Sequence, residues 1–400
     1  MTRQGPLTGM RVIELAHIMA GPACGMMLAD MGADVIKVEK PDGDDSRRFV
    51  PPDIMGESAA FMMMNRNKRG IALNLKDPDA IKVLRVLLDG ADVVIENYRH
   101  DTMERLGLGY DTLRERNPRL VYCAVSGFGR TGPYAERGGF DLIAQGMSGL
   151  MSITGEGPGR PPVKPGAPIA DITAGFLAAL GCTAAYSHAQ ATGQGQMVDT
   201  SLFEAGISLT YWQSAIAFAT GRAPQAVGSA HPLNAPYQSF RTRDGWINIG
   251  AANQRNWLRL LDVIEAQALD NDSRFGSNHD RINNLHDLVP ILESHLQSRD
   301  TEDWLARMEA AGLPAGPVMD ICEMHRDPQA MARQMIVETE HPIAGHVKAL
   351  GSPIKFSETP GAVTRPAPTL GQHGPEVLAE YGYDDAKIAS LQEKGVLLVA

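Results

Sequence analysis

The first 125 residues alternate short apolar runs with helical segments, and this alternation constrains the fold more than any other feature. The runs, rich in β-branched side chains, occupy residues 11–16, 34–39, 71–75, 92–96 and 120–125. Helical patterns fall between them at residues 22–31 and 78–89, and the second opens with Asp77-Pro78, a helix-start signal. Short strands separated by helices predict an α/β fold with a parallel, doubly wound sheet.

The rest of the chain predicts a second, smaller domain. Two helical patterns at residues 172–190 and 202–220 carry many small side chains, which favours close helix packing. A turn-rich segment follows them, and then a hairpin signal centred on Arg243-Asp244-Gly245. Strand signals return after residue 335, and helices end the chain. We therefore predict a discontinuous large domain over residues 1–222 and 335–400, interrupted by a small α+β domain over residues 223–334.

Charge and hydropathy exclude several classes of function. The chain has 37 Lys and Arg against 47 Asp and Glu, a net charge of −10. This argues against binding to nucleic acid or to an anionic membrane, although a local basic pocket stays possible. The longest apolar stretches, such as residues 174–186, fall short of the ~20 residues of a membrane helix. The N-terminus has no apolar signal core, so we expect no membrane association.

Cysteine and histidine usage predicts a reduced protein without a metal site. The four cysteines contain no C-x-x-C pair and form no disulfide framework. The eleven histidines show no H-E-x-x-H motif and no Cys/His cluster with ligand spacing. A cytoplasmic location without a bound metal is the expectation.

The first strand, turn and helix resemble a nucleotide-binding unit in outline. A glycine turn opens the helix at Gly21, and the acidic Glu39 ends the next strand. However, the turn lacks the second glycine of G-x-G-x-x-G, and Pro22 has no N–H to offer a pyrophosphate. Bound NAD is therefore disfavoured. No G-x-S-x-G elbow supports a serine hydrolase either.

Basic and amide side chains follow the predicted strands at their carboxyl ends. Lys76 comes after the third strand, while Asn97, Arg99 and Arg105 come after the fourth. Ligands of open α/β sheets bind beyond these ends, and cations there pair well with phosphates. A solvated charged loop is the alternative. The glycine-rich segment 127–133 and the later Gly138-Gly139 pair fit either a ligand cradle or ordinary turns.

Asp171 stands at the start of a long apolar helix, after a Pro- and Gly-rich loop. One interpretation is a helix N-cap, which contributes ~1 kcal/mol. The other is a nucleophile, because a carboxylate flanked by Ala170 and Ile172 can be desolvated and held by backbone N–H groups.

Taken in order, these segments resemble the class III CoA-transferases, a family that includes formyl-CoA transferase and carnitine CoA-transferase. The similar stretches cover essentially the whole chain: PLTGMRVIELAHIMAGPACGMMLADMGADVIKVEKPDGDDSR, NRNKRGIALNLK, ADVVIENYR, LVYCAVSGFGRTGPYAERGGFDLIAQGMSGLM, PIADITAG, TGQGQMVDTSLFEA and PYQSFRTRDGWINIGAANQ.

The resemblance implies a Rossmann-like CoA-binding large domain and a ring-like chain interlocked with a second copy in a homodimer. It places the catalytic aspartate at Asp171 and implies catalysis through an aspartyl mixed anhydride and an aspartyl-CoA thioester. Coenzyme A would enter as the acyl-CoA co-substrate, and small carboxylic acids would be the other partners. The implied CoA contacts are Lys40, Leu73, Asn74, Lys76, Asn97, Arg99, Arg105 and Arg137.

Two departures from related sequences narrow the expected substrates. Formyl-CoA transferases carry Gln where this chain has Met19, which argues against formyl-CoA and oxalate. The 2-methylacyl-CoA racemases carry a histidine where this chain has Phe140, which can serve as neither acid nor base. The closest likeness is to the branch that acts on dicarboxylic acids, with succinyl-CoA among its donors. His231, Arg241 or Arg255 would then bind the second carboxylate. Racemisation and non-catalytic CoA binding remain the alternatives.

Overall fold

A computed structural model describes residues 5–399 of the chain, so the ends of the predicted large domain, residues 1–4 and 400, lie outside it. The described residues form two compact units. The first, here called the sheet unit, runs up to Gly149 and includes Pro165–Leu209 and the chain from Pro328 onward. The second, the small unit, comprises Leu150–Lys164 and Thr210–Asp327.

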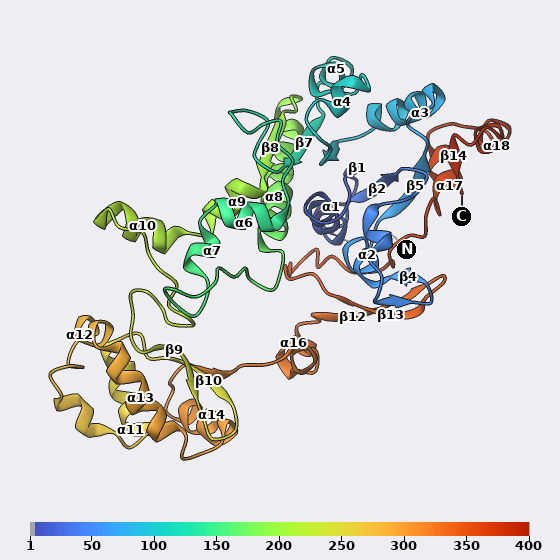
Figure 1. The fold of residues 1–400 in the computed structure, drawn as a ribbon. Helices are drawn as coiled ribbons and strands as arrows, with labels where there is room; N and C mark the ends of the chain where they lie inside the picture. The colour runs from blue at the N-terminus through green and yellow to red at the C-terminus, as the bar shows by residue number, and fades with distance from the viewer. Residues whose placement is uncertain (1–4, 400) are drawn as a thin grey trace. The chain divides into compact units, whose positions relative to one another are not determined.

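A seven-stranded sheet forms the centre of the sheet unit (Figure 1), in the order β14-β5-β2-β1-β6-β7-β8. Every neighbouring pair is parallel except β14 and β5, which are antiparallel. This confirms the predicted parallel α/β sheet. The strands are β1 (Arg11–Leu15), β2 (Asp34–Glu39), β5 (Arg69–Leu73), β6 (Val93–Glu96), β7 (Val121–Ser126), β8 (Met197–Ser201) and β14 (Leu397–Leu398).

The strand order contains a topological switch point between β1 and β6. From β1 the chain adds β2 and then β5 on one side, and afterwards returns to add β6, β7 and β8 on the other. The connections therefore leave β1 and β6 in opposite directions, which opens a crevice at their carboxyl ends. Open α/β sheets bind their ligands in this crevice.

Helices cover both faces of the sheet, so its strands are apolar on both sides. Val12 belongs to one core with α1 (Ala20–Asp30), α8 (Ile169–Thr192) and α9 (Leu202–Ser208). The next residue, Ile13, belongs to the opposite core, as alternation along a strand requires. That core includes residues of α3 (Pro78–Asp89), α5 (Tyr110–Arg116), α17 (Gly374–Glu380) and α18 (Asp385–Glu393).

The helix α8 is longer than the sequence patterns predicted. It has 24 residues, most of them apolar or small, so by length and composition alone it could cross a membrane. The expectation that every apolar stretch falls short of this length is wrong for this helix. Helices buried in a protein core can have the same length and composition. α8 packs on α1 at Gly175, where a Cβ would lie 2.6 Å from the Cβ of Ala23. This close packing explains its small apolar side chains.

The sheet unit also carries short elements around its sheet. The hairpin of β12 (Ile336–His341) and β13 (Gly345–Leu350) matches the strand signals predicted after residue 335. The other elements are η1 (Asp45–Arg48), β3 (Asp53–Ile54), β4 (Glu57–Ser58), α2 (Ala59–Met64), α4 (Thr102–Arg105), α6 (Asp141–Met147) and α16 (Pro328–Ala332).

The small unit is built on a three-stranded antiparallel sheet, in the order β11-β10-β9. Its hairpin is the one predicted around Arg243-Asp244-Gly245, and its core includes Phe240, Ile247 and Trp257. The single helix expected over residues 202–220 is instead two helices that break at Leu209 and Thr210. The elements are α7 (Leu150–Ile153), α10 (Tyr211–Thr220), β9 (Tyr237–Arg241), β10 (Trp246–Gly250), α11 (Gln254–Val263), η2 (Gln267–Asn271), α12 (Asn278–Asn283), α13 (Leu285–Leu296), α14 (Thr301–Ala310), β11 (Ala315–Pro317) and α15 (Ile321–Met324).

Candidate active site

A cavity of about 490 Å³ lies at the switch point of the sheet unit. The loops after β1, β6 and β7 line it, together with the starts of α6 and α8. Asp171, Asn97, Arg99 and Arg137 are all among the lining residues. Four of the residues selected from the sequence therefore meet in one crevice.

The loop after β1 is fixed by the end of β6. The backbone N–H of His17 donates to Asn97 Oδ1 at 3.0 Å, and Asn97 Nδ2 donates to the carbonyl oxygen of His17 at 2.8 Å. The next residue, Ile18, has a φ of 68°, which is rare for a β-branched residue. Its N–H donates to Asp44 Oδ1 at 3.0 Å. Side chains from two other segments thus hold the loop in a strained conformation.

A buried network of charged side chains holds the loop after β1 in place. Lys37 Nζ lies 3.1 Å from Glu14 Oε1 and 2.8 Å from Asp44 Oδ2, and it donates to the carbonyl oxygen of Ala16 at 2.7 Å. Lys68 Nζ pairs with the other oxygen of Glu14 at 2.8 Å. Burial opposes the charge of Lys37, but the attraction of Glu14 and Asp44 outweighs it and raises the pKa of the ammonium.

The sequence analysis missed these network residues. The signal that could have found them is a charged residue inside an otherwise apolar strand. Glu14 and Lys37 occupy such positions in β1 and β2.

Asp171 is the third residue of α8, and Pro168 occupies the N-cap position. The N-cap interpretation of Asp171 is therefore wrong. The capping group is Asp141 of α6, whose Oδ1 accepts the N–H of Ala170 at 2.9 Å and that of Asp171 at 3.4 Å. Because another carboxylate takes the backbone donors, the side chain of Asp171 is left available to the cavity.

The acidity of Asp171 is strongly shifted. Burial and the nearby negative charge of Asp141 raise the pKa of the Asp171 carboxyl to about 7. Both effects disfavour the ionised form. A more basic carboxylate is also a better nucleophile once it is ionised, so the shift suits a group that attacks an acyl carbon.

The two glycine segments of the cavity wall touch each other through their backbones. A Cβ added to Gly127 would lie 2.7 Å from Gly139 Cα, and one added to Gly139 would lie 2.5 Å from Gly127 Cα. Such distances do not occur in real structures, so neither position admits a side chain without moving the wall. The glycine loop is also tied to β6, because Arg130 forms an ion pair with the buried Glu96.

Two of the predicted CoA contacts lie just outside the lining of the cavity. Lys40 is exposed and pairs with Asp45 at 2.7 Å, and Asp45 itself lines the cavity. Arg105 is exposed and donates to the hydroxyl of Thr102, another lining residue, at 3.2 Å. Within the cavity, the Arg137 guanidinium stacks over the ring of Tyr134 at 4.0 Å. Lys40 and Arg105 thus each contact a residue of the lining, and Arg137 is part of the lining itself.

Leu73, Asn74 and Lys76 are not brought into the cavity. Leu73 ends β5, and Asn74 and Lys76 follow it. Because β2 separates β5 from β1, the three residues lie at the same sheet edge about 10 Å from β1. Leu73 is fully buried in the core, whereas Lys76 is exposed. The side chain of Asn74 accepts the N–H of Lys76 at 3.4 Å.

The small unit has a cavity of its own, of about 630 Å³. His231 lines it and stacks on the ring of Tyr237 with centroids 5.2 Å apart. Arg241 and Arg255 are not among the lining residues. Arg241 instead lies over the ring of Trp246 at 5.3 Å. Of the three candidates for binding a second carboxylate, His231 alone lines this cavity.

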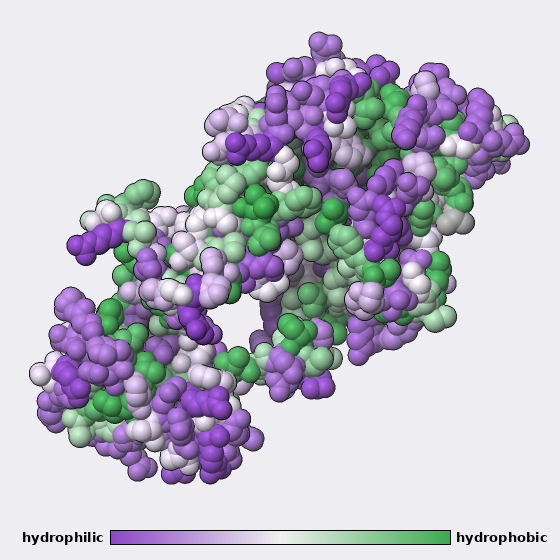
Figure 2. All heavy atoms as spheres, in the orientation of Figure 1, coloured by the Kyte–Doolittle hydropathy of each residue, from purple (hydrophilic) through white to green (hydrophobic). Residues whose placement is uncertain are grey.

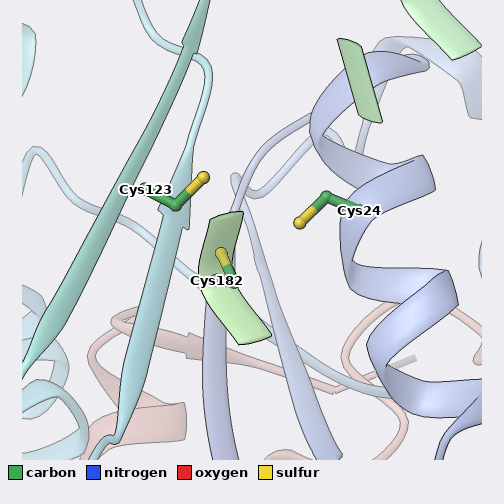
Figure 3. Close-up of side chains that lie close together, drawn as sticks. All are labelled: Cys24, Cys123 and Cys182. Atoms are coloured by element: carbon green, nitrogen blue, oxygen red, sulfur yellow. The ribbon is translucent and has the colours of Figure 1, made fainter. Parts of the chain in front are cut away.

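Three cysteines that are distant in the sequence meet in the core of the sheet unit. Cys24 of α1, Cys123 of β7 and Cys182 of α8 are fully buried, and their sulfur atoms lie within 4.8 Å of one another (Figure 3). Three thiolates would suit a soft metal. However, the hydrogen bond with Cys123, and burial in addition, raise the pKa of the Cys24 thiol well above its usual value. The sequence spacing did not predict this cluster.

Comparisons with known proteins give one consistent result. Residues 7–374 match the model of CoA-transferase family III. The succinate–glutarate CoA-transferase of Agrobacterium fabrum is 41% identical over 94% of this chain and 96% of its own length. Succinyl-CoA:glutarate CoA-transferase of Homo sapiens is 35% identical over 98% of this chain and 90% of its own length. The crystal structure of a CAIB/BAIF family protein from Brucella suis has a TM-score of 0.85 at 38% identity, covering 95% of this chain and 100% of that protein. The chain therefore belongs to CoA-transferase family III and is a class III CoA-transferase.

Proposed function

We propose that this protein transfers CoA from an acyl-CoA, succinyl-CoA being the first donor to test, to a dicarboxylic acid, with Asp171 as the nucleophile. The observation that carries the proposal is the desolvated carboxyl of Asp171 in a crevice that also contains Arg99 and Arg137. The names of the relatives from Agrobacterium fabrum and Homo sapiens support the dicarboxylate acceptor.

The proposed reaction consists of four successive acyl transfers. The Asp171 carboxylate attacks the thioester carbonyl, forms a mixed anhydride and releases CoA thiolate. The thiolate attacks the aspartyl carbonyl, which gives an enzyme–CoA thioester and frees the donor acid. The acceptor carboxylate attacks that thioester, forms a second mixed anhydride with Asp171 and again releases the thiolate. The thiolate then attacks the acceptor carbonyl, which yields the new acyl-CoA and regenerates Asp171.

The cavity offers what these steps require. Each attack creates an oxyanion, and backbone N–H groups can approach it closely only where side chains are absent, as at Gly127 and Gly139. The anhydride and the thioester must also be kept from water, which burial of Asp171 favours.

CoA would extend along the carboxyl edge of the sheet. From the loop after β7 to the end of β5 the edge spans four strand spacings, or about 19 Å. A ligand that reaches from Asp171 along this edge would pass Asn97 and then Lys40 before it meets Lys76. A single CoA on this path would contact both the implied residues inside the crevice and Leu73, Asn74 and Lys76 outside it.

A homodimer is part of the proposal. Large apolar side chains of α6, α8 and α9 are exposed in the sheet unit, where these helices contact one another. Figure 2 shows hydrophobic residues gathered over these helices. An exposed apolar patch of this kind is typical of an interface. Its members are Leu142, Ile143, Met147, Phe176, Leu177, Leu180 and Ile207. The interlocked arrangement of the two chains is the one that the family resemblance implies.

The four free cysteines favour a cytoplasmic location, because disulfides are rare in that compartment.

Phe140 supports transfer over racemisation. It lines the cavity, exposes 70% of its surface and has no group that can exchange a proton. A racemase needs an acid and a base on opposite sides of the α-carbon. The position at which related racemases carry a histidine is therefore filled here by an inert side chain.

The direct test is a screen of donors and acceptors. We expect the protein to form glutaryl-CoA or another dicarboxylyl-CoA when it is incubated with succinyl-CoA and the free acid, as measured by mass spectrometry. Failure with every donor and acceptor pair would refute the transferase proposal. Exchange of the α-hydrogen of a 2-methylacyl-CoA for deuterium, without any acceptor, would support racemisation instead.

The activity should depend on pH through Asp171. Because the carboxyl must be ionised to attack, and its pKa is raised to about 7, we expect kcat/KM to rise with pH up to about 7 and to fall about tenfold per pH unit well below it. Asp141→Asn removes a neighbouring negative charge, while an amide oxygen can still accept the N–H of Ala170. This variant should move the acidic limb to lower pH. An unchanged limb would show that another group controls it.

A further inference from the structure

A second cavity of the sheet unit, of about 380 Å³, shares no residue with the crevice that contains Asp171. It is lined by His341 at the end of β12, by Arg365 in the segment that follows β13, and by His373 just before α17. None of these residues has a role in the transfer reaction described above.

His341 lines this cavity and carries a buried donor without a partner in the described part of the chain. The residue exposes 3% of its surface. Its Nδ1 accepts the backbone N–H groups of Ile343 at 3.2 Å and Ala344 at 3.0 Å, so the ring proton must be on Nε2. Nε2 is buried and has no hydrogen-bond partner among residues 5–399. A buried N–H without an acceptor is costly, and a ligand oxygen would remove that cost.

His373 has the same tautomer for the same reason. Its backbone N–H donates to the carbonyl oxygen of Gly70 at 2.8 Å, and its Nδ1 accepts the N–H of Gly70 at 3.1 Å. The proton of the neutral ring is therefore again on Nε2. Burial, together with the nearby positive charge of Arg365, lowers the pKa of His373 to about 4, so the ring is neutral at physiological pH.

Arg365 supplies a positive charge to the lining of this cavity. Its Nη1 is buried without a hydrogen-bond partner, and within the described part of the chain its guanidinium forms no ion pair. The two carboxylates of the cavity are engaged elsewhere. Glu376 pairs with Arg69 at 3.0 Å, and Glu340 pairs with His346 at 2.8 Å.

We propose that this cavity binds a small oxyanion, a carboxylate or a phosphate, through Arg365 and the Nε2–H groups of His341 and His373. A guanidinium combined with neutral N–H donors is suited to such an oxygen cluster. The same tautomers argue against a metal ion, because a ring nitrogen that carries a proton has no lone pair to donate. The adjacent guanidinium would also repel a cation.

An anion at this position would join distant parts of the sheet unit. His341 belongs to the β12–β13 hairpin, whereas His373 is bonded to Gly70 within β5. Occupancy would thus couple the hairpin to the strand whose carboxyl end bears Asn74 and Lys76.

The test is isothermal titration calorimetry of the full chain with inorganic phosphate and, separately, with acetate, a monocarboxylate outside the proposed substrate class, at constant ionic strength. We expect one of the two anions to bind, and its identity to distinguish phosphate from carboxylate recognition. Arg365→Gln should weaken this binding at least tenfold. Arg116→Gln, the matched loss of an exposed arginine that lines neither cavity, should leave it unchanged.

A second measurement keeps the proposal testable if Arg365→Gln fails to fold. In ¹⁵N-histidine spectra of the wild-type chain, the bound anion should shift the Nε2–H signals of His341 and His373. The proposal is overturned if neither anion binds at concentrations up to about 10 mM, if binding survives Arg365→Gln, or if the two histidine signals do not respond.

Discussion

Replacing Asp171 by alanine should reduce kcat by about 10⁴-fold or more, because the proposed anhydride forms on the carboxyl that the variant lacks. Asp171→Asn should be equally inactive while it keeps the volume of the side chain. Both variants should fold, since the N–H groups at the start of α8 are capped by Asp141 and not by Asp171. Steady-state assays with the best donor and acceptor pair measure the loss.

A carboxylate in a similar local setting provides the control. Asp111 lies in the first turn of α5, outside the crevice, so Asp111→Asn should retain full activity. The wild-type enzyme incubated with acyl-CoA should also gain the mass of a CoA thioester on the peptide that contains Asp171. Undiminished turnover in Asp171→Ala would rule out the aspartyl mechanism, and a bound CoA without any adduct would favour a non-catalytic binding protein.

Replacing Lys37 by methionine should destabilise the protein by about 3–5 kcal/mol. Lys37 is fully buried and joins Glu14 to Asp44, so its loss leaves Asp44 facing the interior without its cation. The carbonyl oxygen of Ala16 loses its donor as well. Denaturant unfolding followed by circular dichroism measures the change in the free energy of unfolding.

An exposed ion pair between a lysine and an aspartate provides the control. Lys82 pairs with Asp79 at 2.7 Å on the surface of α3, so Lys82→Met should produce no measurable change. If Lys37→Met were equally harmless, the network would not hold the loop after β1. Where the variant remains folded, we expect its KM for acyl-CoA to rise more than that of Lys82→Met, because the strained conformation at Ile18 loses its support.

Local patterns predicted most strands of the sheet in their order, but they missed β8 and did not give the exact bounds and pairings of the elements. Periodic apolar runs identified β1, β2, β6 and β7 nearly in full. The strand expected at residues 71–75 lies instead at Arg69–Leu73, because Arg69 and Gly70 are buried in the sheet despite their low strand propensity. The short strand β14 has too few residues to show a period and exists only through its pairing with β5.

In the candidate site, too, some residues were predictable from local patterns and others depended on tertiary contacts. Asp171, Asn97 and Arg99 could be selected because each follows a strand or begins a helix, whereas Arg137 was implied by the family resemblance alone. The structure brings all four into one cavity. The role of Asp141 as the cap of α8 could not be predicted, because the two aspartates are 30 residues apart and meet only through the packing of α6 on α8. The cysteine cluster and the cavity at His341 likewise depend on tertiary contacts alone.

The antiparallel strand at the end of the chain has a practical consequence. β14 covers the open edge of β5, a strand in which all five residues are buried. Without Leu397 and Leu398, that edge would present unpaired N–H and carbonyl groups to neighbouring molecules, a known route to edge-to-edge aggregation. A purification tag is therefore better placed at the amino terminus, and truncated variants that stop before residue 396 are expected to lose solubility.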